Sequence, residues 1–413
     1  MRPCHFYISF NPLFNRHSTF KTQAHEFYYE LKEKVSIDPS ASLYWGKLQM
    51  SEYTESLNFS HFEEVFKTNH EKGDDTVLFV SDYQHLWVGR VSEITQHAPA
   101  MSETLSFYQD KKVEIWFKVS DFDLISNDAQ GTADLLAQLY VDNHYYQYKV
   151  KEMGPYNSGI RFPMIIQNGM DEKYFYDFGG KDISHRVKLE NSLVATPGES
   201  MRLNNIIQTY VIPEENFKKL PELVRSQIIY AEILLLEATA GGKKDRAKLE
   251  QSILTYLRCL EILLNHTFIN HLKREEGHRL FVTKDHPVKF LRSPLDRDKK
   301  NLLRLKDLTE IVELGQIKML MDAPTFFNNT SLDYVFRNHK RFWEYCRLEL
   351  RSTLKNESLI EIRNTLAKGE SIDIYDQELI LVRNILLGVG GRGVFNDIIR
   401  NYYSDEKPVE EVA

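Results

Sequence analysis

Three polar residues near the C-terminal end of the chain have side chains suited to contact phosphate. They are Arg363, Asn364 and Lys368, within the run Arg-Asn-Thr-Leu-Ala-Lys-Gly at 363–369. Arginine presents a fork of donors that matches phosphate oxygens and can stabilise a negatively charged transition state. A lysine with an ordinary pKa of ~10.4 is protonated at neutral pH, so Lys368 can bind phosphate but needs a lowered pKa to act as a base. The alternative is that Arg363 and Asn364 only cap and tether helices.

In the half of the chain that carries this run, apolar residues recur at the spacing typical of helices. The period begins at about Leu220, and Pro221 suits the first turn of a helix. Gly241-Gly242 separates two long helices, the second with an apolar stripe from Leu249 to Leu264. Further helices are predicted at about 300–321, 331–354, 357–368, 374–387 and 394–403. The run at 363–369 is therefore expected on a helix of an all-α bundle.

Short strands dominate the pattern of the N-terminal segment 1–150. Strands are predicted at about 5–10, 43–48, 76–80, 86–91, 113–119 and 145–150, and helices at about 20–35 and 59–66. Strands at this density suggest a small β-barrel with helices. Trp45, Trp87 and Trp116 each fall in a predicted strand, either as barrel core or as a surface on which a flipped base stacks. Prolines and glycines in 151–215 indicate short strands and loops that either complete the first domain or stand apart.

Composition narrows the classes of partner. The formal net charge is -7, so no global basic field indicates nucleic acid, although residues 243–306 hold 16 Lys and Arg against 8 Asp and Glu. This local excess is either a solvated helix surface or a phosphate-contacting one. Cys4, Cys259 and Cys346 are too far apart for a zinc spacing or a disulfide framework. Cysteines of this kind fit a reducing cytosol, so we expect a cytoplasmic protein without metal or cofactor. No apolar run approaches the roughly 18 residues of a membrane span, so we expect no membrane contact.

The run at 363–369 resembles the Arg-Asn-x-x-x-His signature of HEPN domains, and the likeness covers about residues 220–403. In active HEPN ribonucleases, arginine and histidine from two protomers meet across a dimer interface. The resemblance therefore implies a homodimer with a metal-independent endoribonuclease site at Arg363, Asn364 and Lys368. Lys368 stands where the histidine is expected, and loss of general acid–base help costs roughly 10²–10⁴ in rate. We expect attenuated or lost cleavage, with RNA as the partner of this domain.

Residues 42–150 resemble the EVE domain, a PUA-like barrel. The likeness rests on Tyr44-Trp45, Ser51-Glu52-Tyr53-Thr54, Gly73-Asp74 before Val77-Leu78-Phe79, Val88-Gly89-Arg90-Val91 and Trp116-Phe117-Lys118-Val119, in this order. EVE domains are implicated in recognising modified bases in DNA, chiefly methylated or hydroxymethylated cytosine. The resemblance implies a base-binding pocket formed by Tyr44, Trp45, Phe79, Ser81, Trp87 and Trp116. Two departures are the extra N-terminal segment that precedes Tyr44 and the pair Val80-Ser81, where an aromatic-polar pair is usual.

These observations predict an α+β protein with an N-terminal PUA/EVE-like barrel and a C-terminal all-α HEPN-like bundle. The predicted domains are 1–150 for the barrel with its N-terminal extension, 151–215 for the connecting segment, 216–405 for the helical domain and 406–413 for a frayed tail. The expected function is nucleic-acid surveillance or antiviral defence, with DNA binding at the barrel coupled to a helical effector or dimerisation domain. Two alternatives remain: an active endoribonuclease using Arg363, Asn364 and Lys368, and a non-catalytic interaction scaffold whose aromatic pocket is filled by its own side chains.

Overall fold

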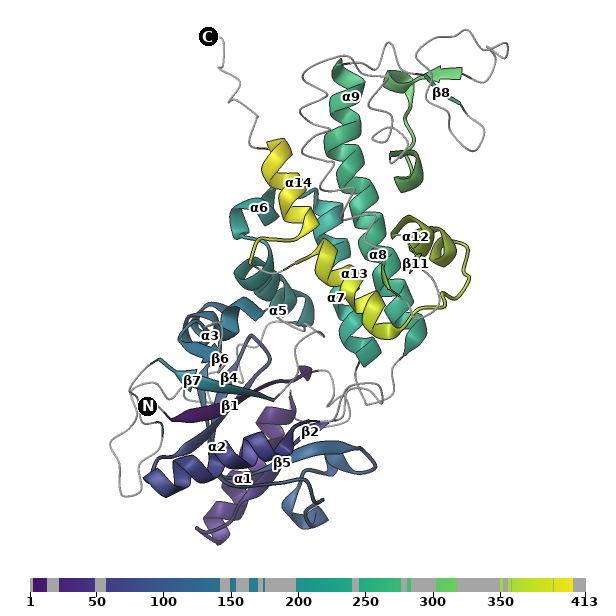
Figure 1. Cartoon of the computed structure of the whole chain (residues 1–413). Helices are drawn as coiled ribbons and strands as arrows, with labels where there is room; N and C mark the ends of the chain where they lie inside the picture. Colours follow the sequence, from purple (N-terminus) through teal and green to yellow (C-terminus); the bar gives the residue numbers. More distant parts are fainter. Residues whose placement is uncertain are drawn as a thin grey trace, which may run out of the picture. The chain divides into compact units, whose positions relative to one another are not determined.

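The computed structural model describes residues 3–12, 22–48, 57–141, 149–153, 163–169, 174, 198–239, 245–275, 281–283, 302–317, 350–351, 356–357, 359–388 and 390–403. The chain divides into two compact units (Figure 1). The first unit comprises Met1–Val211 with Leu235–Asp245, and the second comprises Ile212–Leu234 with Arg246–Ala413. The protein is α+β, with a mixed sheet in the N-terminal unit and helices in the C-terminal one.

A seven-stranded mixed sheet organises the first unit, in the order β2-β5-β4-β3-β1-β7-β6. β1 and β3 are parallel, and the other pairings of described strands in this sheet are antiparallel. β-branched and aromatic residues, which favour strands, fill the central ones. The strands are β1 Cys4–Ser9, β2 Leu43–Leu48, β3 Thr76–Ser81, β4 Leu86–Thr95, β5 Val113–Ser126, β6 Leu139–Val141 and β7 Met164–Asn168.

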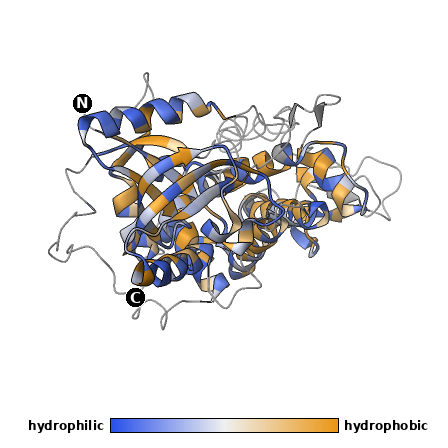
Figure 2. Cartoon of the chain, turned by 90° about the horizontal axis from the view of Figure 1, so that it is seen from below, coloured by the Kyte–Doolittle hydropathy of each residue, from blue (hydrophilic) through white to orange (hydrophobic). Residues whose placement is uncertain are grey.

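Helices complete the core of this unit. Phe27 and Leu31 of α1 (Gln23–Ile37) and Phe62 of α2 (Phe59–Lys72) pack in one cluster with strand residues. Local signals set the helix ends, because the Thr22 hydroxyl accepts from the His25 amide at the start of α1 and Gly73 closes α2 with φ +71°. α3 (Ala129–Leu136), α5 (Glu199–Ile206) and the π-helix η5 (Ile207–Val211) also belong to this unit. Figure 2 shows hydrophobic colouring along the strands and alternating colours along the helices.

The structure confirms the predicted strands that became β1 to β5 and the helices that became α1 and α2. The predicted strand at 145–150 lies largely outside the described residues, and its last residue, Val150, begins a 3-10 turn that ends at Met153. The open question about 151–215 has an answer at β7, which pairs antiparallel with β1 and so extends the first sheet. Among the described strands the pairings run from β2 to β6 without a bridge between these two ends.

Helices build the second unit. α12 and α13 both pack on α8, and α14 contacts α6 and α8. The apolar stripe from Leu249 to Leu264 is buried along α8, as the helical period predicts. The elements are α6 Glu214–Lys219, the first part of α7 (Glu222–Thr239, whose residues 235–239 belong to the first unit), α8 Arg246–Leu264, the π-helix η6 Asn265–Ile269, α9 Asn270–Glu275, α12 Leu359–Ala367, α13 Asp376–Leu386 and α14 Val394–Tyr403.

The prediction of a helix over 300–321 is wrong for the part described at its start. Leu302–Arg304 form strand β9, which pairs with β8 (Phe281–Thr283), and a 3-10 turn follows at Leu305–Asp307. A non-local strand pairing here overrides a local period that also fits a helix. A second short ladder joins β10 (Leu350–Arg351) to β11 (Asn356–Glu357), so the unit is not purely α. The rest of the helix predicted over 331–354 lies outside the described residues.

Candidate functional site

The Arg363 side chain is held on the second unit by an acidic residue of another helix. α12 buries Leu359, Ile362 and Leu366 and packs on α8. Arg363 lies one residue beyond the buried Ile362, and its Nε is 2.9 Å from Oε1 of Glu261 on α8. Its Nη2 donates to Oε2 of the same carboxylate at 3.2 Å. The pair is largely but not fully buried, since 16% of the Arg363 side chain and 9% of the Glu261 side chain remain exposed.

Asn364 and Lys368 lie on the solvent side of this pair. Nη1 of Arg363 donates to Oδ1 of Asn364 at 3.1 Å, so the arginine orients the neighbouring amide. Asn364 is exposed, and so is Lys368, which follows the last turn of α12. Gly369 ends the turn with φ +75°, a conformation that glycine adopts without strain. The structure thus brings Arg363 and Asn364 together, whereas among the described residues the Lys368 ammonium makes no hydrogen bond or ion pair.

Arg246, at the start of α8, fixes the loop that follows Lys368. Its Nη2 donates to the Ile372 carbonyl at 2.9 Å, and its Nη1 donates to the Ile374 carbonyl at 3.0 Å and to Asp376 Oδ1 at 2.6 Å. Nε pairs with Glu250 at 2.8 Å. α8 therefore holds the α12 segment at two points, through Glu261 at Arg363 and through Arg246 at the loop after α12.

Another Arg-Asn pair, at 383–384 on α13, repeats this geometry in the core. Arg383 Nε and Nη2 donate to the two oxygens of Glu232 on α7, at 2.8 and 3.0 Å, and Nη1 donates to Asn384 Oδ1 at 3.1 Å. Tyr256 hydrogen-bonds the same carboxylate, and Arg383 has no exposed surface. This pair was not predicted from the sequence, although the same dipeptide stands at both places. Because the copy on α13 is wholly structural, the dipeptide alone does not indicate a site, and the exposure of the residues around Arg363 distinguishes α12.

The six residues of the predicted base pocket are all buried. Tyr44, Trp45, Trp87 and Trp116 belong to the hydrophobic core cluster of the first unit. Trp87 stacks on Phe122 with ring centroids 5.3 Å apart and planes inclined by 3°. Because side chains alternate along a strand, Phe79 and Ser81 point away from the face that carries Leu78 and Val80 of the cluster. Four of the six therefore belong to one core cluster, although the adjacent Tyr44 and Trp45 point to opposite faces of β2, and a base could enter only if the core opened.

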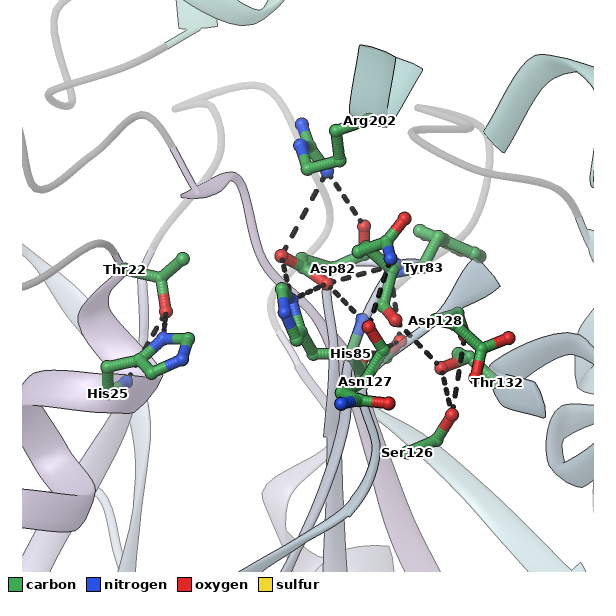
Figure 3. Close-up of polar contacts among 12 residues, drawn as sticks. Thr22, His25, Asp82, Tyr83, His85, Ser126, Asn127, Asp128, Thr132 and Arg202 are labelled. Atoms are coloured by element: carbon green, nitrogen blue, oxygen red, sulfur yellow. Dashed lines mark hydrogen bonds and ion pairs between the residues drawn. The ribbon is translucent and has the colours of Figure 1, made fainter. Parts of the chain in front are cut away.

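A polar cluster lies where β3, β4 and β5 meet at one edge of the sheet (Figure 3). Asp82 accepts hydrogen bonds from the backbone amides of Gln84 and His85, at 3.0 and 2.6 Å, and its carboxylate lies 3.1 Å from Nδ1 of His85. Arg202 of α5 donates to the Asp82 carbonyl at 3.2 Å. Tyr83, within this turn, has φ +68°, an unusual conformation for a residue with a side chain. The sequence predicts strands on both sides of this segment but does not indicate that Asp82 pairs with His85 and Arg202.

Electrostatics in this cluster favour a structural role. Burial raises the pKa of Asp82, but the charges and hydrogen bonds of His85 together with Arg202 outweigh burial and hold this pKa well below its ordinary value. The ionised Asp82 carboxylate is placed to accept a hydrogen bond from Nδ1 of His85, an arrangement also used to orient catalytic histidines. Here both side chains are buried, so the contacts fix the β3–β4 turn in its strained conformation.

Within the described ranges, no group of three or more His, Cys, Asp or Glu side chains is placed to hold a metal ion. None of the described helices combines the length and apolar character needed to cross a membrane. No model of a known protein family matches the chain, and neither a curated protein nor a solved structure matches it.

Proposed function

We propose that this chain is a nucleic-acid-binding surveillance or defence protein. In this proposal the N-terminal unit is an EVE-like, PUA-type barrel that senses a base in DNA, modified or not. The C-terminal unit is a HEPN-like effector or dimerisation domain that binds RNA at α12 within a homodimer. The resemblance in sequence motivates both assignments, and the fold class of the two units is compatible with them.

The observation that carries the proposal is the presentation of α12. Its buried face and the Arg363–Glu261 pair hold the helix on α8, while Asn364 and Lys368 remain exposed. A cation and an amide beside a partly exposed guanidinium provide donors for phosphate oxygens. Without a histidine at position 368, phosphate binding is better supported than proton transfer, because a protonated lysine does not accept the proton of a 2′-hydroxyl.

DNA duplexes with plain, methylated or hydroxymethylated cytosine, titrated at two salt concentrations, test the sensor half of this proposal. A base sensor binds one of the three selectively, and Trp87→Ala weakens that binding. Equal and salt-sensitive binding to all three would reduce the contact to the DNA backbone. No binding to any duplex would refute DNA sensing.

The exposure of Lys368 also favours a second candidate, a working endoribonuclease with Arg363, Asn364 and Lys368 at a dimer interface. In that case a lysine ammonium serves as acid or charge stabiliser for the leaving oxygen. RNA cleavage by the wild type that is lost in Arg363→Ala but kept in Lys219→Ala, an exposed lysine of α6, would establish this candidate. Absence of cleavage with intact RNA binding supports the effector without catalysis.

The closed packing of Trp45, Trp87 and Trp116 favours a third candidate for the first unit, a non-catalytic interaction scaffold. These rings already contact other side chains of the core, as the Trp87–Phe122 stack illustrates. Intrinsic tryptophan fluorescence separates the two readings, since three of the four tryptophans lie in this unit. A base that stacks on them changes the emission on DNA binding, whereas a scaffold gives no change with any duplex.

A further inference from the structure

Glu261 is the acidic residue at the centre of the α12 site. Its Oε1 accepts a hydrogen bond from the Leu314 amide at 2.9 Å and also faces Arg363 Nε. Its Oε2 accepts from Arg363 Nη2. The carboxylate is thus fixed by the backbone of one segment and by the guanidinium of another, and Glu261 itself is buried on α8.

These contacts leave Arg363 with one defined orientation. Nε and Nη2 face Glu261, and Nη1 is bonded to Asn364. An arginine fork has five N–H donors, so hydrogens on the two Nη atoms remain for a further acceptor. The side chain is 16% exposed and the Nη1–Asn364 hydrogen bond lies at the surface, so a phosphate oxygen can approach this end of the guanidinium.

The Arg383–Glu232 pair has the same arrangement but is buried from solvent. There both side chains are almost wholly buried, with 0% of Arg383 and 2% of Glu232 exposed. The Tyr256 hydroxyl also donates a hydrogen bond to the Glu232 carboxylate. Such a network can serve only the packing of α7, α8 and α13. The Glu261–Arg363 pair keeps the orientation but leaves part of the guanidinium open to solvent.

We infer that Glu261 is a positioning residue for the nucleic-acid site at Arg363. It holds the guanidinium in the orientation that presents its outer donors, and its negative charge keeps the affinity of this arginine for phosphate moderate. The inference rests on the proposed RNA binding at α12. In a bound complex, Glu261 restricts Arg363 to one geometry of phosphate binding, whereas a free arginine could bind phosphate in many orientations.

RNA binding to four full-length proteins tests the charge part of this inference. The proteins are the wild type, Glu261→Gln, Arg363→Ala and the double variant, titrated with a short labelled single-stranded RNA at low salt. Glu261→Gln keeps an oxygen for the Leu314 amide but removes the charge, so we expect binding about two- to fivefold tighter, the range of one partly exposed ion pair. The gain must vanish in the Arg363→Ala background. Glu215→Gln, on the exposed surface of α6, controls for the loss of one negative charge.

The outcomes separate this inference from the proposed function. A gain no larger than that of Glu215→Gln, or one that persists without Arg363, overturns the role of Glu261. If neither the wild type nor any variant binds RNA, the proposed function of α12 fails instead.

The side-chain Nε–Hε NMR signal of Arg363 tests the positioning role by itself, because it is measured without RNA. We expect it to be well dispersed in the wild type and to move to the position of free arginines in Glu261→Gln, and an unchanged signal overturns positioning.

Discussion

The buried ion pair of the second unit offers a prediction whose magnitude follows from burial. In Arg383→Met, the Glu232 carboxylate loses both guanidinium contacts while its side chain stays 2% exposed. Removing one partner of a buried pair costs about 3–5 kcal/mol, because the remaining charge has lost its compensation. Tyr256 still donates to the carboxylate, which places the expected cost near the lower end, at about 3 kcal/mol.

The matched change at the Arg-Asn pair of α12 has a different expected size. Arg363→Met breaks a pair in which 16% of the arginine and 9% of the glutamate are exposed, so water can partly replace the lost partner. We expect a loss of about 1 kcal/mol or less. The double variant Glu232→Met with Arg383→Met removes both buried charges and should recover more than half of the loss of the single variant, because apolar replacements of buried pairs are often neutral.

Urea unfolding followed by circular dichroism at 222 nm measures both effects, because helices dominate the signal and most of the described ones lie in the second unit. With a slope of about 2–3 kcal/mol per molar urea, Arg383→Met should lower the midpoint by at least about 1 M, and Arg363→Met by less than about 0.5 M. Equal shifts for the two arginines would refute the assignment of one pair to the core and the other to a partly open site. So would a double variant as unstable as Arg383→Met.

Three further predictions concern a buried histidine, a glycine and the lysine of the α12 site. Burial lowers the pKa of His5 to about 4, so the unfolded chain binds the proton at a higher pH than the folded protein does. The stability that is present above pH ~6.5 is therefore lost as the pH falls toward 4. The melting temperature of the first unit should fall over this interval, and it should fall less in His5→Phe. Gly46→Ala would place a Cβ 2.8 Å from Cζ3 of Trp116, so we expect a loss of about 1–3 kcal/mol, against little change for Gly198→Ala, whose Cβ meets nothing within 4 Å. Lys368→His supplies a group with a pKa near ~6.5, so we expect the rate of RNA cleavage to rise at least about tenfold and to become pH-dependent near neutral pH. No rise in the rate would count against a ribonuclease-derived site.

Local signals in the sequence were sufficient to predict those helices and hairpins that depend mainly on neighbouring residues. The hairpin of β3 and β4 follows from two apolar runs around a polar turn, and the register that pairs Val80 with Trp87 agrees with it. α12, α13 and α14 follow from the helical period and glycine stops. The strand at 302–304 could not be found this way, because its state depends on pairing with β8, a separate segment that lies earlier in the chain.

The candidate site was only partly accessible to sequence reasoning. The motif itself is contiguous, so Arg363, Asn364 and Lys368 could be selected by type and spacing. Glu261 could not, because it is distant in the sequence and only the packing of α12 on α8 brings it to Arg363. For the tryptophans, residue type does not separate a core ring from a binding ring. The turn at Asp82 likewise shows its partners, His85 just before β4 and Arg202 on α5, only after folding.

In the function proposed above, the exposed end of α12 binds nucleic acid through Lys368 and Arg363. The most direct measurement is the affinity of the full-length protein for a short single-stranded RNA, compared between Lys368→Glu and Lys219→Glu at two salt concentrations. Both variants reverse one exposed lysine of the second unit, so general charge effects are equal. We predict that Lys368→Glu weakens binding at least about fivefold more than Lys219→Glu and lowers its salt dependence. Equal effects of the two substitutions would contradict the assignment of α12 as the binding surface.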